Sequence, residues 1–528
     1  MWKRARAGLK VWIPLLVLSV GAAASVYFVC NAQEAIGTDP ASQAVTVDNE
    51  HFYKNGQPFH FVGFNQYYML EQARSEETRS MVDEVLRDAQ KLGMTVMRTW
   101  AFDDTENGLQ PKAGEFNESV FQALDYVLDT SAKHGIHVIL AIVNYWPDYG
   151  GMESYVKWCT DSTTIANSSV SEFYNNPLCR QMYKNTMQTL MNRKNSINGR
   201  VYKNDPTILG WDLANEPRNP GDPSSDLLTG WIDEMSNFAK MLSPTQLVTT
   251  GLEGFFGLST PTIAMKDNPA NNWDYWVCQG TDFIRQHDLP SIDFSVAHLY
   301  PDFWVTGDCN GSAYCKQLFA SRWVDTHIEQ SKKIRKPFVL EEFGSSTMVN
   351  GSYTGLMDHR EDIFEAVYSE LEHAASEAEL GTGSLFWTFS SLQYPDFDGF
   401  TVYHGGQGVP LDTYNKRESP HWQTLEHTPD NIDAVDFEVL HHLRMGQENL
   451  EKDFRNKRKH EQCMNFLKKE AQKGTISTRY KRAGNSRGLV LAQSGDQTDE
   501  STSPHDDTID IIVGAASILK DLTWQRLG

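Results

Sequence analysis

The chain has 528 residues, of which 40% are hydrophobic and 22% charged, so it is long enough for one large barrel or for two domains. Its 69 acidic residues against 47 basic ones give a formal net charge of −22, which disfavours nucleic acid and anionic membranes as partners and fits a neutral substrate. The 14 tryptophans favour a carbohydrate site, because flat aromatic rings pack on sugar faces, although core packing explains many of them equally well.

The first 32 residues are typical of a targeting segment. Basic residues precede an apolar run at 11–30, and Ala22-Ala23-Ala24 offers small residues for cleavage. A cleaved signal peptide is favoured, and a signal anchor remains open because the run is almost long enough to span a bilayer. In either case the remainder is expected outside the cytosol, as a secreted or surface-anchored protein. Glycosylation sequons stand at Asn117, Asn167, Asn310 and Asn350.

Cysteine use is low, which indicates a fold that does not depend on disulfides. Neither a CxxC nor an HxxxH pattern occurs, so the sequence predicts no metal and no cofactor. Two pairs of cysteines are close enough in the sequence to form disulfides, Cys159 with Cys179 and Cys309 with Cys315. Two further cysteines, Cys278 and Cys463, have no obvious partner.

A unit consisting of a short apolar β-rich run, a polar loop and an amphipathic stretch recurs along the chain. A hairpin is predicted at 51–59, before the first of eight strands. The strands are expected at 61–65, 95–99, 138–143, 208–213, 247–252, 294–298, 338–341 and 384–387. Helices are expected between them at 78–92, 118–134, 177–195, 227–242, 318–334 and 360–379, with only 283–288 in the irregular fifth interval.

After the eighth strand, a last helix is expected at about 432–458, where it would close the fold. From about residue 468 the chain is rich in Ser, Thr, Gly and Asp, which predicts a mostly disordered tail at 468–528. Within this tail, 511–519 is apolar enough for a short helix or a binding segment.

Eight βα units predict a (β/α)8 TIM barrel over residues 45–458, expected to be a monomer. An open doubly wound sheet has the same alternation, but no GxGxxG loop follows the first strand. In a barrel, functional side chains gather where the strands end.

Two acidic motifs stand at the ends of the fourth and seventh predicted strands. Pro217 ends the fourth strand, so Asn215 and Glu216 are expected at its carboxyl edge. The seventh strand delivers Glu342 to the same rim from the opposite side of the barrel mouth. Two carboxyl groups that flank a sugar are what glycoside hydrolysis requires, one to protonate the leaving oxygen and one to attack the anomeric carbon. Asn215 is placed to hydrogen-bond the 2-hydroxyl of that sugar.

In this arrangement and in its ordered motifs the chain resembles glycoside hydrolase family 5, in particular the plant- and fungal-type endo-β-mannanases, over most of residues 45–455. The motifs that carry the resemblance are Phe61-Val-Gly-Phe-Asn65, Arg98-Thr-Trp-Ala-Phe102, Tyr149-Gly-Gly151, Tyr155-Val-Lys-Trp158, Asp205-Pro-Thr-Ile208, Asn215-Glu-Pro-Arg218, Gly251-Leu-Glu-Gly-Phe255, Gly280-Thr-Asp-Phe283, His298-Leu-Tyr-Pro-Asp302 and Glu342-Phe-Gly344.

The resemblance implies Glu216 as acid/base and Glu342 as nucleophile. Glu341 competes for the second role, but the family places the nucleophile directly before Phe-Gly, and strand alternation would then turn Glu341 outward. Around this pair the resemblance implies five further site residues. Arg98 keeps the nucleophile ionised, His298 and Tyr300 orient the two glutamates, Trp387 floors the subsite and Trp100 lies beside it. Trp146, Trp158 and Trp304 either extend the cleft or pack.

The chain departs from the family pattern at Trp211-Asp212-Leu-Ala, where Trp-Glu-Leu-Met is more usual. The expected activity is retaining endo-hydrolysis of β-1,4 linkages in mannan, glucomannan and galactomannan, with transfer to sugar acceptors as a side reaction. Three alternatives stay open: a β-1,4-glucanase, an exo-β-mannosidase, and a glycan-binding protein without catalysis.

Overall fold

The structure is a computed structural model that describes residues 44–408, 461–469 and 508–524. Short gaps within these ranges fall at 161–169, 270–272, 306–308, 310–311, 350–351, 354–357, 378–379, 407 and 468. The targeting segment therefore lies outside the described residues, as does the helix expected at 432–458. Among the described helices, none combines the length and the apolar character that a membrane crossing requires.

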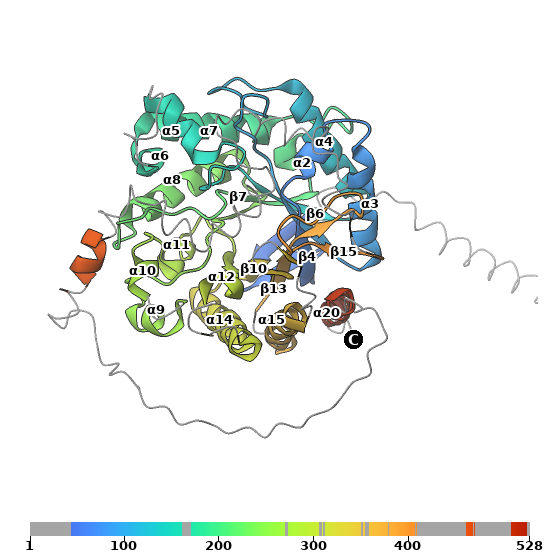
Figure 1. The fold of residues 1–528 in the computed structure, drawn as a ribbon. Coiled ribbons are helices and arrows are strands. Elements are labelled where there is room, and N and C mark those ends of the chain that lie inside the picture. The colour runs from blue at the N-terminus through green and yellow to red at the C-terminus, as the bar shows by residue number, and fades with distance from the viewer. Residues whose placement is uncertain are drawn as a thin grey trace, which may run out of the picture. The chain divides into compact units, whose positions relative to one another are not determined.

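Eight parallel strands form the centre of the molecule, as predicted (Figure 1). Their ladder runs in the order β8-β7-β6-β5-β4-β13-β10-β9, and the Asp293 amide donates a 2.9 Å hydrogen bond to the Val248 carbonyl between the two outer strands. The (β/α)8 barrel is thus confirmed. The strands are β4 (Phe61–Asn65), β5 (Val96–Trp100), β6 (His137–Ala141), β7 (Ile208–Asp212), β8 (Leu247–Thr249), β9 (Ser295–Leu299), β10 (Phe338–Phe343) and β13 (Thr382–Trp387).

Helices surround the strands, and the longer ones bury an apolar stripe. In α3, for example, Val82, Val85, Leu86 and Ala89 are buried at helical spacing. The longer helices lie where the periodicity predicts them, whereas the short helices α2, α5, α6, η4, α9, α10 and α12 were not predicted. The bounds are α2 (Met69–Gln72), α3 (Arg79–Lys91), α4 (Glu118–Lys133), α5 (Gly151–Thr160), α6 (Ser171–Asn175), α7 (Pro177–Asn192), η4 (Tyr202–Asn204), α8 (Asp226–Leu242), α9 (Pro261–Asp267), α10 (Trp273–Val277), α11 (Phe283–His287), α12 (Pro301–Trp304), α14 (Ala313–Ile334) and α15 (Asp358–Ser376).

The predicted N-terminal hairpin covers the amino end of the barrel. It consists of β1 (Val45–Asp48), β2 (His51–Lys54) and β3 (Gln57–Pro58). Phe52 is 1% exposed and sets its ring edge-on to Phe61 and Phe294, with centroids 5.6 and 5.5 Å away. The hairpin therefore closes the apolar bottom of the barrel and leaves the opposite end for the site. Two further small pairs are β11 (Met348–Val349) with β12 (Ser352–Tyr353) and β14 (Phe389–Ser390) with β15 (Val402–Tyr403).

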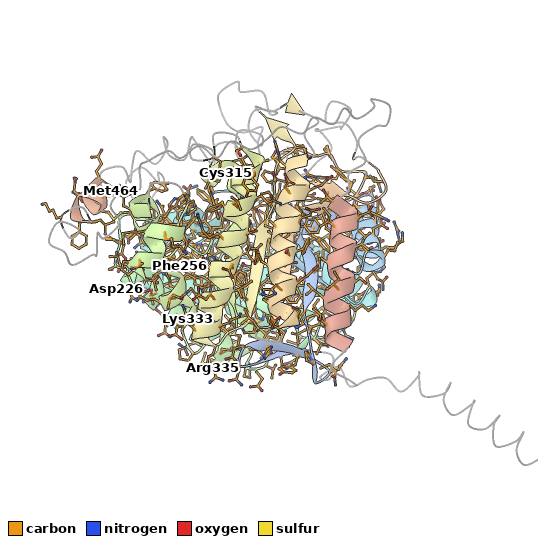
Figure 2. The ribbon with its side chains drawn as sticks, turned by 90° about the horizontal axis from the view of Figure 1, so that it is seen from below. Asp226, Phe256, Cys315, Lys333, Arg335 and Met464 are labelled. Atoms are coloured by element: carbon orange, nitrogen blue, oxygen red, sulfur yellow. A yellow bond between two sulfur atoms is a disulfide. The ribbon has the colours of Figure 1, made fainter. Side chains whose placement is uncertain are left out.

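A helix from the far C-terminus packs on the barrel wall. α20 (Thr508–Trp524) contacts α15 and β4, and Ile512, Ala515 and Leu519 are buried in that contact. Figure 2 shows α14, α15 and α20 side by side. The apolar patch at 511–519 is indeed helical, but the helix is longer than expected and forms part of the fold, within the range that the composition assigned to a tail.

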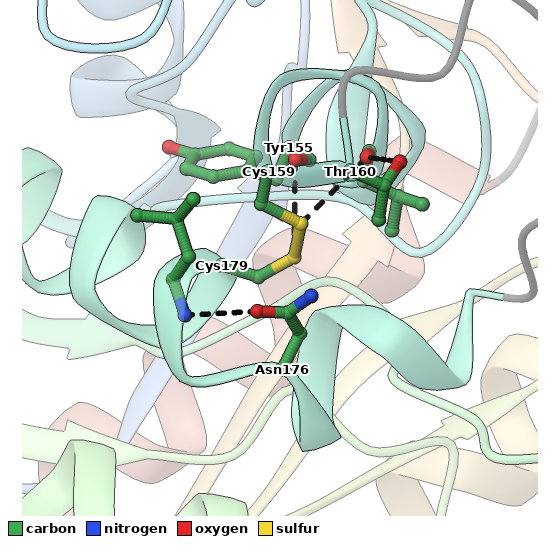
Figure 3. Close-up of a disulfide and its surroundings, with 7 residues drawn as sticks. Tyr155, Cys159, Thr160, Asn176 and Cys179 are labelled. Atoms are coloured by element: carbon green, nitrogen blue, oxygen red, sulfur yellow. Dashed lines mark hydrogen bonds between the residues drawn. A yellow bond between two sulfur atoms is a disulfide. The ribbon is translucent and has the colours of Figure 1, made fainter.

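Three disulfides connect the described residues. The two close pairs form as expected, Cys159 with Cys179 and Cys309 with Cys315 (the first in Figure 3). The third joins Cys278 to Cys463, which are 185 residues apart. The sequence offered no partner for these two cysteines, because nothing local signals so distant a pairing.

Candidate active site

Glu216 stands just beyond β7, in a conformation that aims its side chain into the barrel mouth. Its φ is +48°, in the left-handed region that non-glycine residues seldom adopt, and its amide donates a 2.8 Å hydrogen bond to the Gly251 carbonyl. The side chain is nearly buried and hydrogen-bonded at both oxygens. Oε2 accepts from the Trp146 indole at 2.6 Å, and Oε1 lies 2.7 Å from Nδ1 of His298.

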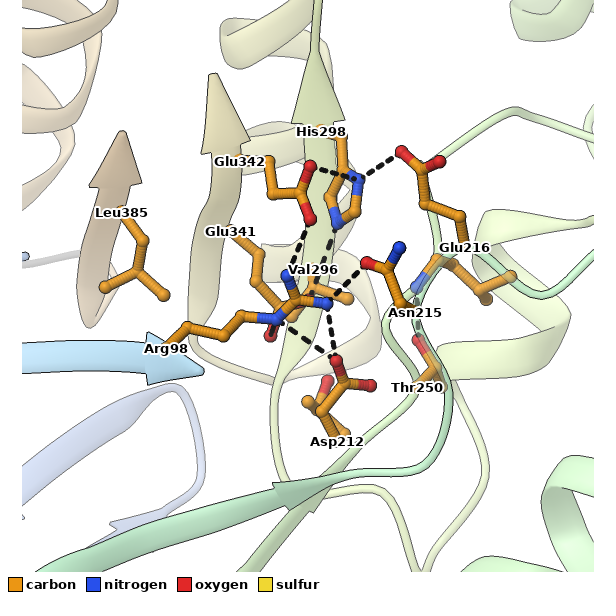
Figure 4. Close-up of polar contacts among 12 residues, drawn as sticks. Arg98, Asp212, Asn215, Glu216, Thr250, Val296, His298, Glu341, Glu342 and Leu385 are labelled. Carbon is orange, nitrogen blue, oxygen red and sulfur yellow. Dashed lines mark hydrogen bonds and ion pairs between the residues drawn. The ribbon is translucent and has the colours of Figure 1, made fainter. Parts of the chain in front are cut away.

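Glu342 enters the same space from β10. Its Oε1 accepts from Nη1 of Arg98 at 2.6 Å and its Oε2 from the Tyr300 hydroxyl at 2.7 Å. One carboxylate oxygen of Glu216, one of Glu342 and one ring nitrogen of His298 all lie within 4.8 Å of one another (Figure 4). The structure thus brings together two carboxyl groups that are far apart in the chain, with an imidazole between them.

Arg98 organises the floor of the site from β5. Besides Glu342, its guanidinium donates to Asp212 at 2.7 and 3.1 Å, to Asn215 at 2.8 Å and to Asn65 at 3.2 Å. The arginine is 1% exposed, so these bonds form away from water, where charge-assisted hydrogen bonds are strong. Asn215 also donates to Asn144, which fixes the orientation of its amide.

The buried charges shift one another's titration. Burial alone would lower the pKa of His298, but the charge of Glu342, the hydrogen bond to Glu216 and the nearby Glu341 side chain raise it to about 10. Burial acts to raise the pKa of Glu216, and the hydrogen bond and charge of His298 outweigh that effect and lower it. Both shifts favour the imidazole as the donor in the 2.7 Å hydrogen bond between the two residues.

For Glu342 burial dominates and raises the pKa, while the charges of His298 and Arg98 and the Tyr300 hydroxyl act in the opposite direction. Arg98 and Tyr300 therefore donate to both carboxyl oxygens of Glu342, and the side chain is almost fully buried.

Glu341 does not point outward, contrary to the sequence prediction. It is fully buried, with Oε1 3.5 Å from Nε of Arg98 and Oε2 3.7 Å from Nε2 of His298. Alternation from Val339, which packs inside the barrel, already places Glu341 inside. The pairing of β10 with β9 shifts register between Leu340 and Glu342, so both neighbouring glutamates face the interior.

Aromatic rings form one wall of the site. Trp387 ends β13 and stacks on Tyr67 with centroids 5.1 Å apart and an angle of 3° between the planes. Trp100 lies 4.9 Å from the same tyrosine, so Tyr67 joins the two tryptophans that the sequence singled out. Trp158 and Trp304 pack instead against neighbouring rings, Trp158 on Tyr155 and Trp304 on Trp323.

Several site residues escaped the sequence prediction. Arg218 lies over the Trp146 ring at 5.1 Å and binds Glu253 at 2.6 Å, behind the indole that donates to Glu216. Burial raises the pKa of Glu253 to about 7, against the lowering effect of Arg218. Arg218 and Glu253 both stand in sequence motifs at strand ends, and this position could have marked them as site residues. No sequence feature indicated that Asp212 contacts Arg98.

Chemically, the arrangement offers one carboxyl hydrogen-bonded to an imidazole, a second carboxyl held by an arginine and a tyrosine, and a wall of aromatic rings. Within the described residues, Glu216, His298 and Glu342 are also the one group of three whose atoms have the spacing for a metal ion. Their mutual hydrogen bonds suit acid–base chemistry, and the predicted function invokes no metal or cofactor.

Comparison with known proteins agrees with this chemistry. Residues 42–408 match the profile of the glycoside hydrolase family 5 β-mannosidase-like proteins. Mannan endo-1,4-beta-mannosidase 5 of Solanum lycopersicum is 36% identical over 386 residues, which cover 72% of this chain and 90% of that protein. Mannan endo-1,4-beta-mannosidase 5 of Arabidopsis thaliana is 38% identical over 339 residues, covering 64% and 76%.

Solved structures agree as well. The endo-1,4-beta-D-mannanase of Thermotoga petrophila RKU-1 matches with a TM-score of 0.53 and 30% identity, over 66% of this chain and 96% of that one. The endo-1,4-beta-mannanase of Rhizomucor miehei matches with a TM-score of 0.54 and 27% identity, over 69% and 95%.

Proposed function

The chain belongs to the β-mannosidase-like proteins of glycoside hydrolase family 5, and from this premise we propose that it hydrolyses internal β-1,4 linkages of mannan, glucomannan and galactomannan with retention of configuration. The observation that carries the proposal is the close approach of Glu216 and Glu342, whose oxygens lie within 4.8 Å of His298 and of each other. Retaining glycosidases hold their carboxyl groups about 5 Å apart, and inverting ones roughly 7–9 Å.

In the first step Glu342 attacks the anomeric carbon, and the bond from that carbon to the leaving oxygen breaks. Glu216 gives the leaving oxygen its proton, which returns from His298 to Glu216 across their 2.7 Å hydrogen bond as the substrate arrives. In the second step water attacks the glycosyl-enzyme, gives a proton to Glu216 and releases Glu342. A sugar hydroxyl in place of that water gives transglycosylation.

The neighbours of the pair have matching roles in this scheme. Arg98 and Tyr300 hold the oxygens of Glu342 and select its carboxylate form. Asn215, fixed by Arg98, is available to the sugar 2-hydroxyl. Trp387 supplies the aromatic floor for the ring that is attacked, with Trp100 beside it.

The protein is proposed to act outside the cytosol. Three disulfides are consistent with an oxidising compartment, and the N-terminal segment has the composition of a signal peptide or signal anchor. Asn117, one of the four sequons, is the N-cap of α4; the other three lie outside the described residues.

A digest of mannohexaose beside cellohexaose, with the anomeric form of the new reducing ends followed by NMR, tests the proposal. Mannobiose and mannotriose with an initial excess of the β-anomer are expected, and cellohexaose should remain largely intact. Release of mannose alone would indicate an exo-mannosidase, and faster loss of cellohexaose a glucanase. An initial α-anomer would exclude retention, and binding without any turnover would indicate a glycan-binding protein.

A further inference from the structure

Glu341 is a buried acidic side chain to which the double-displacement scheme assigns no role. It is 0% exposed, and among the described residues neither of its oxygens has a hydrogen-bond partner. Burying a carboxyl group without a hydrogen-bond partner costs free energy, which directs attention to the charged and polar groups nearest to Glu341. The nearest candidates are Nε of Arg98 at 3.5 Å and Nε2 of His298 at 3.7 Å.

Arg98 has other partners for all its donor nitrogens. Nη1 donates to Glu342 and Asn65, and Nη2 donates to Asp212 and Asn215. Nε, the atom nearest to Glu341, donates to Asp212 at 3.1 Å. The arginine therefore contributes charge to Glu341 and leaves it without a direct donor.

Within the described part of the chain, His298 has a ring nitrogen that lacks a hydrogen-bond partner. Its Nδ1 faces Glu216, whereas Nε2 is buried and has no partner among the described residues. Figure 4 shows the ring of His298 between the two glutamates, with Glu216 on one side and Glu341 on the other. In a histidine, the partner of one nitrogen decides the proton and the orientation at the other.

Building on the proposed hydrolysis, we propose that Glu341 is a positioning residue for proton delivery. Its carboxylate accepts the Nε2–H of His298 and so keeps Nδ1, with the proton that it shares, directed at Glu216. The present 3.7 Å separation becomes a hydrogen bond after a shift of about 0.8 Å, and catalytic hydrogen bonds often tighten when substrate binds. The result is a line of three groups, Glu341–His298–Glu216, in which the outer carboxylate orients the imidazole.

The surrounding charges fit this assignment. Glu341 on β10 faces Arg98 from β5, Asp212 from β7 and His298 from β9, with Glu342 next to it in the chain. Burial raises the pKa of Asp212 to about 8, and Glu341 adds to that rise, so Asp212 is the group that takes up a proton when the interior carries excess negative charge.

Two substitutions of Glu341 and one control test the role. Glu341→Gln keeps size and an acceptor oxygen but loses the charge, and Glu341→Leu loses both. We expect kcat on mannohexaose to fall about 10-fold and about 100-fold respectively, with KM changed less than threefold. Without the negative charge the shared proton is held less tightly, so the alkaline limb of the kcat/KM profile should move to lower pH by about one unit. Wild-type kcat and an unmoved alkaline limb in both variants would overturn the proposal.

Asp212→Asn is the matched control, because it also removes a buried carboxylate beside Arg98 but leaves the neighbour of Nε2 in place. In ¹⁵N-labelled wild-type protein, the Nε2–H proton of His298 is expected far downfield and protected from exchange. That signal should persist in Asp212→Asn and be lost in Glu341→Leu.

The wild-type spectrum alone needs neither turnover nor a folded Glu341 variant. An ordinary Nε2–H resonance in the wild type, or no proton on Nε2, would overturn the proposal by itself. If the wild type fails to cleave mannohexaose, the proposed function is wrong, and the resonance still decides whether Glu341 holds His298.

Discussion

The two ends of the barrel interior are built by the same strands and differ completely in chemistry. At the amino end the inward side chains are apolar, and Val96, Val296 and Val339 belong to one buried cluster with the hairpin. Two residues further along these strands, alternation places Arg98, His298 and Glu341 inside. On each of these strands the inward side chain therefore changes from an apolar valine to a charged or ionisable residue over two positions.

This contrast separates the source of stability from the site of chemistry. Apolar burial contributes roughly 25 cal/mol per Å², so the amino end stabilises the barrel, whereas four buried carboxyl groups around Arg98 and His298 cost free energy to bury. The apolar layer keeps the strands fixed, and the charged layer is thereby held in a geometry that it would not adopt alone. Substitutions at the two ends should accordingly affect different quantities.

The largest effect is expected from Glu342→Gln at the charged end. Loss of the attacking carboxylate should lower kcat on mannan by about 10⁴-fold or more, equivalent to at least about 5 kcal/mol. The free energy of unfolding in urea should stay the same or rise, because a costly buried carboxylate is gone. Turnover above about 1% of wild type, measured as reducing ends released, would contradict the assignment.

Phe52→Ala at the apolar end should give the opposite result. Removing a buried phenylalanine that touches Phe61 and Phe294 should lower the free energy of unfolding by about 3–5 kcal/mol. The kcat per folded molecule should remain close to wild type. Tyr53→Ala, at the neighbouring and only partly buried position, is the control and should cost clearly less. A Phe52→Ala protein that is as stable as wild type, or that is folded but inactive, would contradict the assignment of stability to the amino end and of catalysis to the opposite end.

Trp146→Phe gives a smaller effect that sharpens the comparison. It keeps the aromatic ring but removes the 2.6 Å hydrogen bond to Oε2 of Glu216. We expect kcat to fall about 10-fold, equivalent to about 1.4 kcal/mol, with KM and the free energy of unfolding almost unchanged. An unchanged kcat would mean that His298 alone suffices to place Glu216.

Much of this arrangement follows from the sequence, because strand alternation and strand ends are local signals. The eight strands and the hairpin were predicted within a few residues, and Arg98, Glu216, His298, Tyr300 and Glu342 meet where the fold class places them. The inward turn of Glu341 was missed because a register shift allows two consecutive residues to face the same side.

Features that depend on distant contacts could not be predicted. The apolar segment of α20 is visible in the sequence, but its docking on α15 joins parts of the chain more than 100 residues apart. The bond between Cys278 and Cys463 likewise has no local pattern. The same holds for Asp212, whose partner Arg98 lies 114 residues away.

The bond between Cys278 and Cys463 makes the chain a closed covalent loop across the interval that contains the last barrel strand. A single peptide cleavage anywhere between residues 409 and 460 would therefore leave two fragments still joined. Because α20 begins only a few dozen residues after Cys463, it would keep a high effective concentration beside α15. It would rebind there whenever it detached. Under reducing conditions the same nicked molecule would lose this covalent link, and α20 would be free to diffuse away.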